Sequence, residues 1–285
     1  MEELKEYIKS TGQHILKNIM KNPREAAFII RFGISSKKAK KRRESLRKEG
    51  KVATSFLIET LNKQCNLFCD GCKCEKNMFF NSEGICWKDL FDAAKKRGVS
   101  SIIFAGEESL ERRDVIYEAA KVKNIIFPLF TKGKAIEEDD IKLFDENRNL
   151  VPILNMGIED NYNSLMNVAD ILHQRGIFYG LCIRINRKNI DKVINNEFLE
   201  VISKKGCNGV LFIEDKSENN ISEFNEKERV FFEEKQYYFR DKFKNMIVIY
   251  LHQKINSTER CLFEDEGIFK INENGEVVSC KKNIL

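Results

Sequence analysis

Short apolar runs alternate with amphipathic segments of helical length from residue 53 onward, and this alternation limits the possible folds. The apolar runs predict strands over 53–61, 101–105, 124–130, 150–156, 178–186 and 208–214. The intervening segments predict helices over roughly 86–97, 110–121, 136–146, 163–175, 189–203 and 226–241. Strands that alternate with helices pair in parallel through right-handed crossovers. Six such units are too few for a closed eight-strand barrel, so the sequence predicts an α/β fold, a partial (β/α)6 TIM-like barrel.

The segments that flank this core have a different character. Apolar residues recur at helical spacing within residues 1–50, which predicts N-terminal helices. After an expected strand over 246–251, two β-rich arms surround an Asn-Gly pair at 274–275, a pair typical of hairpin turns. We therefore expect three parts: an N-terminal helical extension over 1–50, a barrel over 51–245 and a small C-terminal β-hairpin module over 246–285.

Composition and charge argue against several classes of protein. An apolar content of 42% with only three prolines argues against disorder. No apolar run approaches the length of a membrane span, and the charged N-terminus differs from a secretion signal, so we expect a cytoplasmic location. Much of the net charge of +5 comes from residues 36–50, which are expected to form a solvated helix that ends at Gly50. The alternative is a nucleic-acid patch, but no aromatic residues interleave for base stacking, so no nucleic-acid partner is expected.

Three cysteines follow the first expected strand: Cys65, Cys69 and Cys72, at CxxxCxxC spacing. Nine cysteines without a secretion signal favour reduced thiols and metal ligation over disulfides. Three thiolates on one loop can hold three corners of an iron–sulfur cube and leave the fourth iron open to a small molecule. The alternative is a zinc site completed by Cys74 or Cys86, although structural zinc usually uses two separated CxxC-like pairs.

The stretch from residue 62 to Cys72 resembles the cluster loop of the radical S-adenosylmethionine (SAM) superfamily, and the resemblance covers about residues 35–280. It implies a 4Fe–4S cluster bound by Cys65, Cys69 and Cys72, with SAM on the fourth iron. It also implies reductive cleavage of SAM to a 5′-deoxyadenosyl radical, which abstracts hydrogen from a substrate. The resemblance thus implies an oxygen-sensitive enzyme that receives electrons from a flavodoxin- or ferredoxin-type donor.

The same resemblance implies SAM-binding residues at the carboxyl ends of the later strands. Residues 105–107 lie at the end of the second strand, at the place of the Gly-Gly-Glu-Pro motif that holds the SAM amino group. Asn155 ends the fourth strand, at the place of a ribose motif. Arg184 and Asn186 end the fifth, where polar residues often reach the SAM carboxylate or ribose. The expected cofactor-binding residues are Phe68, Ala105, Gly106, Glu107, Asn155 and Arg184.

Several residues depart from the superfamily pattern. Ala105 replaces the first glycine of the motif, where a left-handed backbone would be costly for alanine. Glu108 replaces the motif's proline, which is expected to remove rigidity from the loop and adds a second carboxylate. For Glu107 and Glu108 the alternative is a solvated turn before a helix, since helix starts favour acids. Together with Gly71 and Lys73 beside the third cysteine, these departures motivate an alternative function: a degenerate cluster-binding protein without SAM cleavage.

Two further cysteines, Cys261 and Cys280, flank the expected hairpin in a C-x13-G-x4-C arrangement. This arrangement resembles the opening of the SPASM/Twitch auxiliary-cluster module. It implies a truncated module in which Cys261, Cys280 and Cys74 are candidate ligands of a second iron–sulfur cluster. The alternative is a vestigial hairpin whose cysteines bind no cluster. The truncated module favours a peptide or a natural-product intermediate as substrate, with a lipid or a small metabolite as the alternative.

The remaining cysteines are expected to serve packing. Cys182 and Cys207 lie in or next to expected strands and are predicted to be small buried hydrophobic residues. Cys86 opens a helix beside Trp87, and we expect it to pack as well. None of the three histidines has a partner at a spacing that indicates catalysis, so no catalytic side chain is predicted.

Overall fold

The computed structural model describes residues 7, 10–15, 23–51, 53–61, 86–106, 108–134, 136–157, 162–214, 224–251, 269–271 and 277–279. Several predicted ligands lie outside the described residues: Cys65, Phe68, Cys69, Cys72, Cys74, Glu107, Cys261 and Cys280. The chain divides into two compact units. Unit 1 contains Met1–Ala26, Lys132–Ile136 and Pro152–Gln253, and unit 2 contains Ala27–Thr131, Glu137–Val151 and Lys254–Leu285.

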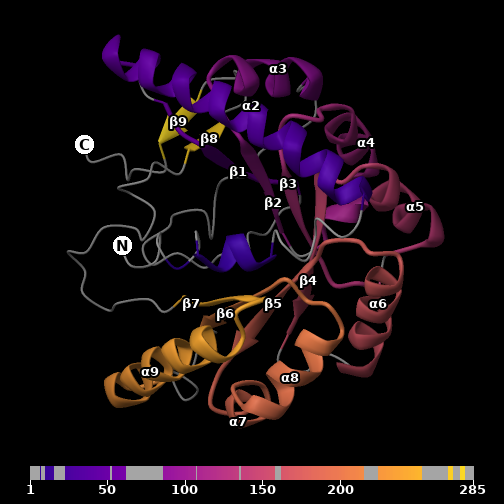
Figure 1. Cartoon of the computed structure of the whole chain (residues 1–285), viewed down its shortest axis with the longest axis vertical. Coiled ribbons are helices and arrows are strands. Elements are labelled where there is room, and N and C mark those ends of the chain that lie inside the picture. Colours follow the sequence, from indigo (N-terminus) through magenta and orange to yellow (C-terminus); the bar gives the residue numbers. More distant parts are fainter. Residues whose placement is uncertain are drawn as a thin grey trace. The chain divides into compact units, whose positions relative to one another are not determined.

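The helices and strands follow in the predicted order (Figure 1). The helices are α2 (Pro23–Lys48), α3 (Trp87–Lys96), α4 (Arg113–Lys121), α5 (Glu138–Glu146), α6 (Tyr162–Gln174), α7 (Ile190–Val193), α8 (Asn196–Lys204) and α9 (Glu226–Lys242), with a short 3-10 helix η2 (Ser109–Arg112). The strands are β1 (Phe56–Thr60), β2 (Ser101–Ala105), β3 (Phe127–Thr131), β4 (Leu150–Met156), β5 (Gly180–Ile185), β6 (Gly209–Glu214), β7 (Ile247–Leu251), β8 (Phe269–Ile271) and β9 (Val277–Ser279).

The strand pairing confirms the predicted fold class. In unit 2 the strand order is β3-β2-β1-β8-β9, and in unit 1 it is β7-β6-β5-β4; β4 begins in unit 2 and continues in unit 1. The pairs β1–β2, β2–β3, β4–β5, β5–β6 and β6–β7 are all parallel. The chain is therefore an α/β protein of the partial TIM-like barrel class. The expected strand over 246–251 is β7, a seventh parallel strand beside β6.

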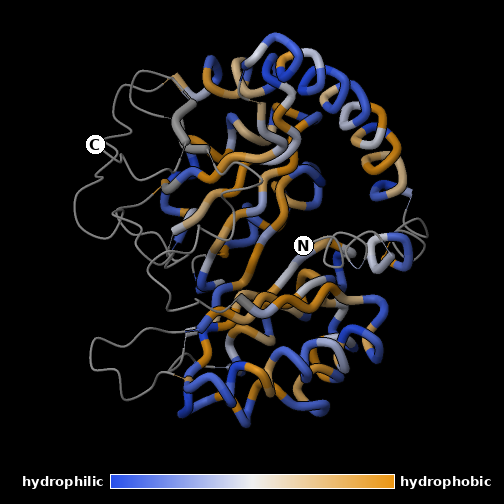
Figure 2. The backbone as a smooth tube through the Cα atoms, turned by 90° about the vertical axis from the view of Figure 1, so that its left-hand side faces the viewer, coloured by the Kyte–Doolittle hydropathy of each residue, from blue (hydrophilic) through white to orange (hydrophobic). Residues whose placement is uncertain are grey.

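An aromatic core holds unit 2 together. In α3 the buried residues Trp87, Leu90, Phe91 and Ala94 recur at the spacing of one helix face. On this face, the ring centroid of Phe91 lies 5.2 Å from that of Phe127 on β3, and Phe127 lies 5.4 Å from Phe104 on β2. In Figure 2, hydrophobic residues (orange) gather along the extended segments of the backbone. Burial of these large rings fixes α3 against the sheet of unit 2.

Helix α2 is anchored by part of its basic run, although the sequence predicted a solvated helix. Arg42 Nε donates to the carbonyl of Lys96 at 3.0 Å, and Arg43 donates to the carbonyl of Gly98 and, at 3.2 Å, to Ser100 Oγ. Lys96 is the last residue of α3, and Gly98 and Ser100 belong to the turn between α3 and β2. The helix ends as predicted, since its last residue is Lys48 and Gly50 follows with a φ of 73°.

Replacing Gly98 with alanine is expected to lower the free energy of unfolding by about 2 kcal/mol. Gly98 has a φ of 81°, and a Cβ there would lie 2.6 Å from the backbone oxygen of Ala39 on α2. The matched control is Gly50→Ala, because Gly50 has a similar φ of 73° and nothing within 4 Å of its Cβ position. Urea denaturation should show a loss of only about 1 kcal/mol for the control. Equal losses would contradict close packing of α2 on this turn.

The C-terminal hairpin is present and joins the sheet of unit 2. Strand β9 pairs with β8 in the antiparallel direction, which confirms the hairpin predicted around residues 274–275. Strand β8 in turn pairs in parallel with β1, with Phe269 opposite Leu57. The hairpin is therefore an added edge of the sheet that contains β1. The domain boundaries at residues 50 and 245 stay predictions. Among the described residues, no helix combines the length and apolar character needed to cross a membrane.

Candidate functional site

In unit 2 the candidate site begins where β2 ends. Ala105 is the last residue of β2, pairs with Thr60 of β1 and is 1% exposed. Its backbone is that of a strand, so the left-handed conformation expected at this position was a wrong prediction. Gly106, one residue later, has a φ of 138°, a conformation that residues with a Cβ rarely adopt. The glycine that the turn requires is therefore present, and Ala105 adds no backbone strain.

Glu108 is buried rather than solvated. It is 9% exposed, and its Oε2 accepts a hydrogen bond from Thr131 Oγ1 at 2.9 Å. Its Oε1 accepts from the backbone N–H of Leu110 at 3.2 Å, so Glu108 caps η2. The alternative of a solvated turn is thus wrong for Glu108. The expected loss of rigidity is also wrong, because the carboxylate ties the loop to β3. For Glu107, both alternatives stay predictions.

In unit 1 the structure places Asn155 and Arg184 on one face of two neighbouring strands, near their carboxyl ends. Asn155 on β4 is directly opposite Cys182 on β5, and Arg184 follows Cys182 by two residues. Because side chains alternate along a strand, Asn155, Cys182 and Arg184 share one face of the sheet. Leu211, opposite Cys182 on β6, shares this face and is only half-buried. Asn155 is 5% exposed and Arg184 is half-buried, so both groups lie on a partly covered surface.

Asn186 and Asn189 close the turn after β5. Asn189 Oδ1 accepts from the backbone N–H of Asn186 at 2.9 Å, and Asn189 Nδ2 donates to the carbonyl of Arg184 at 2.8 Å. Asn186 Oδ1 accepts from the N–H of Lys188 at 2.8 Å. These contacts hold the backbone of Arg184. This turn could have been predicted from the sequence, since two asparagines three residues apart after a strand are typical of side-chain-capped turns.

Glu214 ends β6 and forms an ion pair that the sequence did not reveal. Arg229 of α9 donates to Glu214 through Nη2 at 2.6 Å and through Nε at 3.1 Å. The two side chains are 13% and 4% exposed, respectively. The N–H of Phe224 also donates to Glu214 Oε1 at 3.4 Å. This carboxylate therefore fixes α9 to the sheet of unit 1.

The described cysteines differ in environment. Cys182 and Cys207 are buried as predicted, and burial raises the pKa of each thiol to about 12. Cys207 Sγ also donates to the carbonyl of Gly209 at 3.1 Å. Because the pKa of each thiol is raised, both stay protonated and unreactive near neutral pH. Cys86 precedes α3 and is exposed, so its expected packing role was wrong. Among the described residues, no group of three or more His, Cys, Asp or Glu side chains is placed to hold a metal ion.

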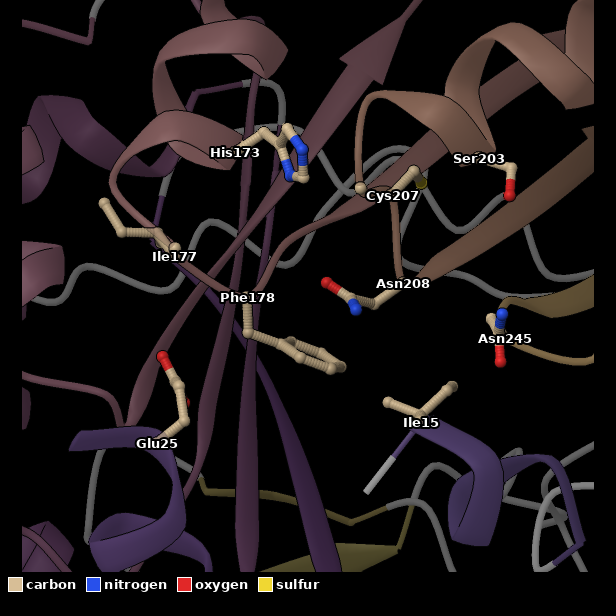
Figure 3. A pocket seen from close by; sticks show the side chains of 11 residues that line it. Ile15, Glu25, His173, Ile177, Phe178, Ser203, Cys207, Asn208 and Asn245 are labelled. Carbon is tan, nitrogen blue, oxygen red and sulfur yellow. The ribbon is translucent and has the colours of Figure 1, made fainter. Parts of the chain in front are cut away.

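A cavity of about 330 Å³ lies in unit 1, at the other end of its strands (Figure 3). Phe178 and Asn208, which precede β5 and β6, line it together with His173 at the end of α6. In Figure 3 the Phe178 and Asn208 side chains point into the same space. In parallel α/β folds the chemistry gathers at the carboxyl ends of the strands. This cavity at the amino ends is therefore separate from the candidate site at Asn155 and Arg184.

No protein-family model matches the chain, and no curated protein matches it. Among solved structures, it is similar to Streptococcus suis SuiB bound to S-adenosylmethionine, with a TM-score of 0.61 and 14% identity over 85% of this chain and 62% of SuiB. SuiB bound to precursor peptide SuiA gives a TM-score of 0.57 at 14% identity, over 85% of this chain and 63% of SuiB.

A third similar structure is anSMEcpe with bound AdoMet and the Cp18Cys peptide. Its TM-score is 0.52 at 16% identity, over 81% of this chain and 74% of anSMEcpe. The chain thus spans less than two thirds of the length of SuiB. At these identities the likeness is one of fold. The chain shares the fold of these proteins, both of which were solved with S-adenosylmethionine bound, and the parallel strands predicted from the sequence belong to this fold.

Proposed function

We propose that this protein is a radical SAM enzyme that cleaves S-adenosylmethionine reductively and abstracts hydrogen from a substrate. One combination of observations carries the proposal. A CxxxCxxC sequence begins at Cys65, shortly after β1 ends at Thr60, in a chain that shares its fold with proteins solved with S-adenosylmethionine bound. In this proposal Cys65, Cys69 and Cys72 ligate a 4Fe–4S cluster, because thiolate sulfur is the ligand that iron–sulfur clusters use.

Each proposed donor matches one polar group of the cofactor. A SAM molecule presents an amino group, a carboxylate and ribose hydroxyls, and we assign the amino group to the segment Ala105 to Glu107. Gly106 directly follows the last residue of β2, so its backbone groups lie at the carboxyl end of that strand. Arg184 supplies a cation for the carboxylate, and Asn155 supplies an amide for the ribose. Phe68, within the cluster loop, is proposed to contact the cofactor as well.

Apolar residues at the same strand ends suit a reaction that must exclude water. Phe104 is opposite Leu129, so Ala105 is next to Phe130 in the sheet of unit 2. Ala105 and Phe130 are 1% and 5% exposed. When bound, the cluster and SAM supply the one-electron cleavage that starts hydrogen abstraction. The buried apolar side chains of the protein limit side reactions with water.

We propose a peptide or a natural-product intermediate as the substrate class. The support is that SuiB was solved with precursor peptide SuiA and anSMEcpe with the Cp18Cys peptide. A lipid or a small metabolite is the alternative. A flavodoxin- or ferredoxin-type protein is the proposed electron donor, and the cytoplasm the proposed location. The C-terminal hairpin is proposed to be a truncated SPASM/Twitch-like module, with Cys261, Cys280 and Cys74 as candidate ligands of a second cluster.

The test is anaerobic reconstitution of the full chain with iron and sulfide, followed by reduction with dithionite in the presence of SAM. We expect about four irons per chain for one cluster, and 5′-deoxyadenosine detected by mass spectrometry. Samples without dithionite serve as the control. An intact cluster that binds SAM without yielding product would support the degenerate cluster-binding alternative. About one zinc per chain, with no iron or sulfide, would instead support a structural zinc site.

A further inference from the structure

The loop after β2 is held from two sides by its own side chains. Ser109, which is 0% exposed, donates from Oγ to the carbonyl of Phe104 on β2 at 3.0 Å. Glu108 reaches the other way and accepts from Thr131, the last residue of β3, also 0% exposed. Gly106, with its φ of 138°, thus lies two residues before two anchored residues, Glu108 and Ser109.

The backbone at Glu108 also excludes the residue that the superfamily places there. Glu108 has a φ of −147° and an extended conformation. Proline fixes φ near −65°, so it cannot adopt the backbone seen at this position. Proline also has no side-chain acceptor for the Thr131 hydroxyl or for the N–H of Leu110. This chain thus stabilises the loop by hydrogen bonds to a carboxylate, on a backbone path that proline does not share.

We propose that Glu108, acting through Thr131, is a positioning residue for SAM binding. It holds the end of β2 and Gly106 so that their backbone can receive the SAM amino group, in place of the missing proline. The inference rests on the proposed function. Glu108 itself does not contact SAM in this proposal. Its two hydrogen bonds take over the stabilising role of the proline that it replaces, so its presence does not indicate lost activity.

The test compares SAM affinity in reconstituted full-length variants by equilibrium dialysis. Glu108→Ala and Glu108→Pro are expected to weaken SAM binding by about tenfold, equivalent to about 1.4 kcal/mol. Glu108→Gln should stay within about threefold of wild type, because its amide can accept from Leu110 N–H and donate to Thr131. Thr131→Val should weaken SAM binding as much as Glu108→Ala does. A variant that combines Glu108→Ala with Thr131→Val should bind SAM no more weakly than either single variant.

Two further measurements separate positioning from general damage. In steady state, Glu108→Ala should raise the KM for SAM while kcat and iron content stay near wild type. Hydrogen exchange without SAM should be faster over residues 105–110. The control is Glu111→Ala, an exposed glutamate of the same short helix, which should leave KM unchanged.

The possible outcomes are distinct. If wild type binds SAM and Glu108→Pro binds it equally well, the positioning role is wrong while the proposed function stands. If wild type binds no SAM although its cluster is intact, the proposed function fails and the positioning role fails with it. In that case, faster hydrogen exchange in Glu108→Ala would still show that Glu108 stabilises the loop after β2.

Discussion

Replacing Cys65 with alanine is expected to remove about four irons per chain and to abolish 5′-deoxyadenosine formation. The reason is that the three-thiolate loop has no spare ligand at CxxxCxxC spacing, so two thiolates would have to hold the whole cluster. Iron and sulfide analysis of the anaerobically reconstituted protein measures the first effect. Product analysis after dithionite reduction measures the second.

Two other cysteine variants test whether the iron loss is specific to the proposed triad and whether a second cluster is present. Cys86→Ala is the matched control, because Cys86 is exposed at the start of α3 and outside the proposed triad. Its iron content should equal that of wild type, and metal loss there would favour a zinc site. Cys261→Ala tests the second cluster. Iron lost only with Cys65 indicates one cluster, whereas iron lost with either residue indicates two.

Replacing Arg229 with methionine is expected to lower the free energy of unfolding by about 3–5 kcal/mol. The change leaves the carboxylate of Glu214, only 4% exposed, without the guanidinium that now lies 2.6 Å away. The hydrogen bond from the N–H of Phe224 remains but is long, at 3.4 Å. Urea denaturation followed by circular dichroism measures the loss.

The matched control is Arg187→Met. Arg187 also pairs with a glutamate of α9, Glu228, at 2.8 Å, but the two side chains are 44% and 34% exposed. Solvent screens such a pair, so its removal should cause little measurable change in stability. If both variants lost stability equally, burial of the Glu214 pair would not be the cause. A double replacement, Glu214→Leu with Arg229→Met, should recover much of the loss, because no charge is then left buried.

Most of the fold could be predicted because the signals are local. The strands fall on short apolar runs, and α3 shows its buried face in the spacing of Trp87, Leu90 and Phe91. The parallel order follows from the alternation with helices. The pairing of β8 with β1 could not be predicted, because it depends on a contact between Leu57 and Phe269, far apart in sequence, and three-residue strands give no register signal.

The candidate site was predicted less completely, for a similar reason. The CxxxCxxC spacing and the polar residues at strand ends are visible along the chain. Glu108 is buried and hydrogen-bonded to Thr131, and only the pairing of β2 with β3 brings these two residues close to each other. Without that contact, two glutamates before a helix are expected to be solvated. The error at Ala105 was one of position, since the unusual φ belongs to Gly106.

The pairing of β8 with β1 has a consequence for how the protein is made. On a ribosome, β1 to β3 emerge early, but the partner of β1 on its other side emerges only after all strands of unit 1. Until then the backbone groups along that edge of β1 are open to other chains, which is a known route to aggregation. Synthesis through residue 279 therefore protects the strand that precedes Cys65 in the sequence.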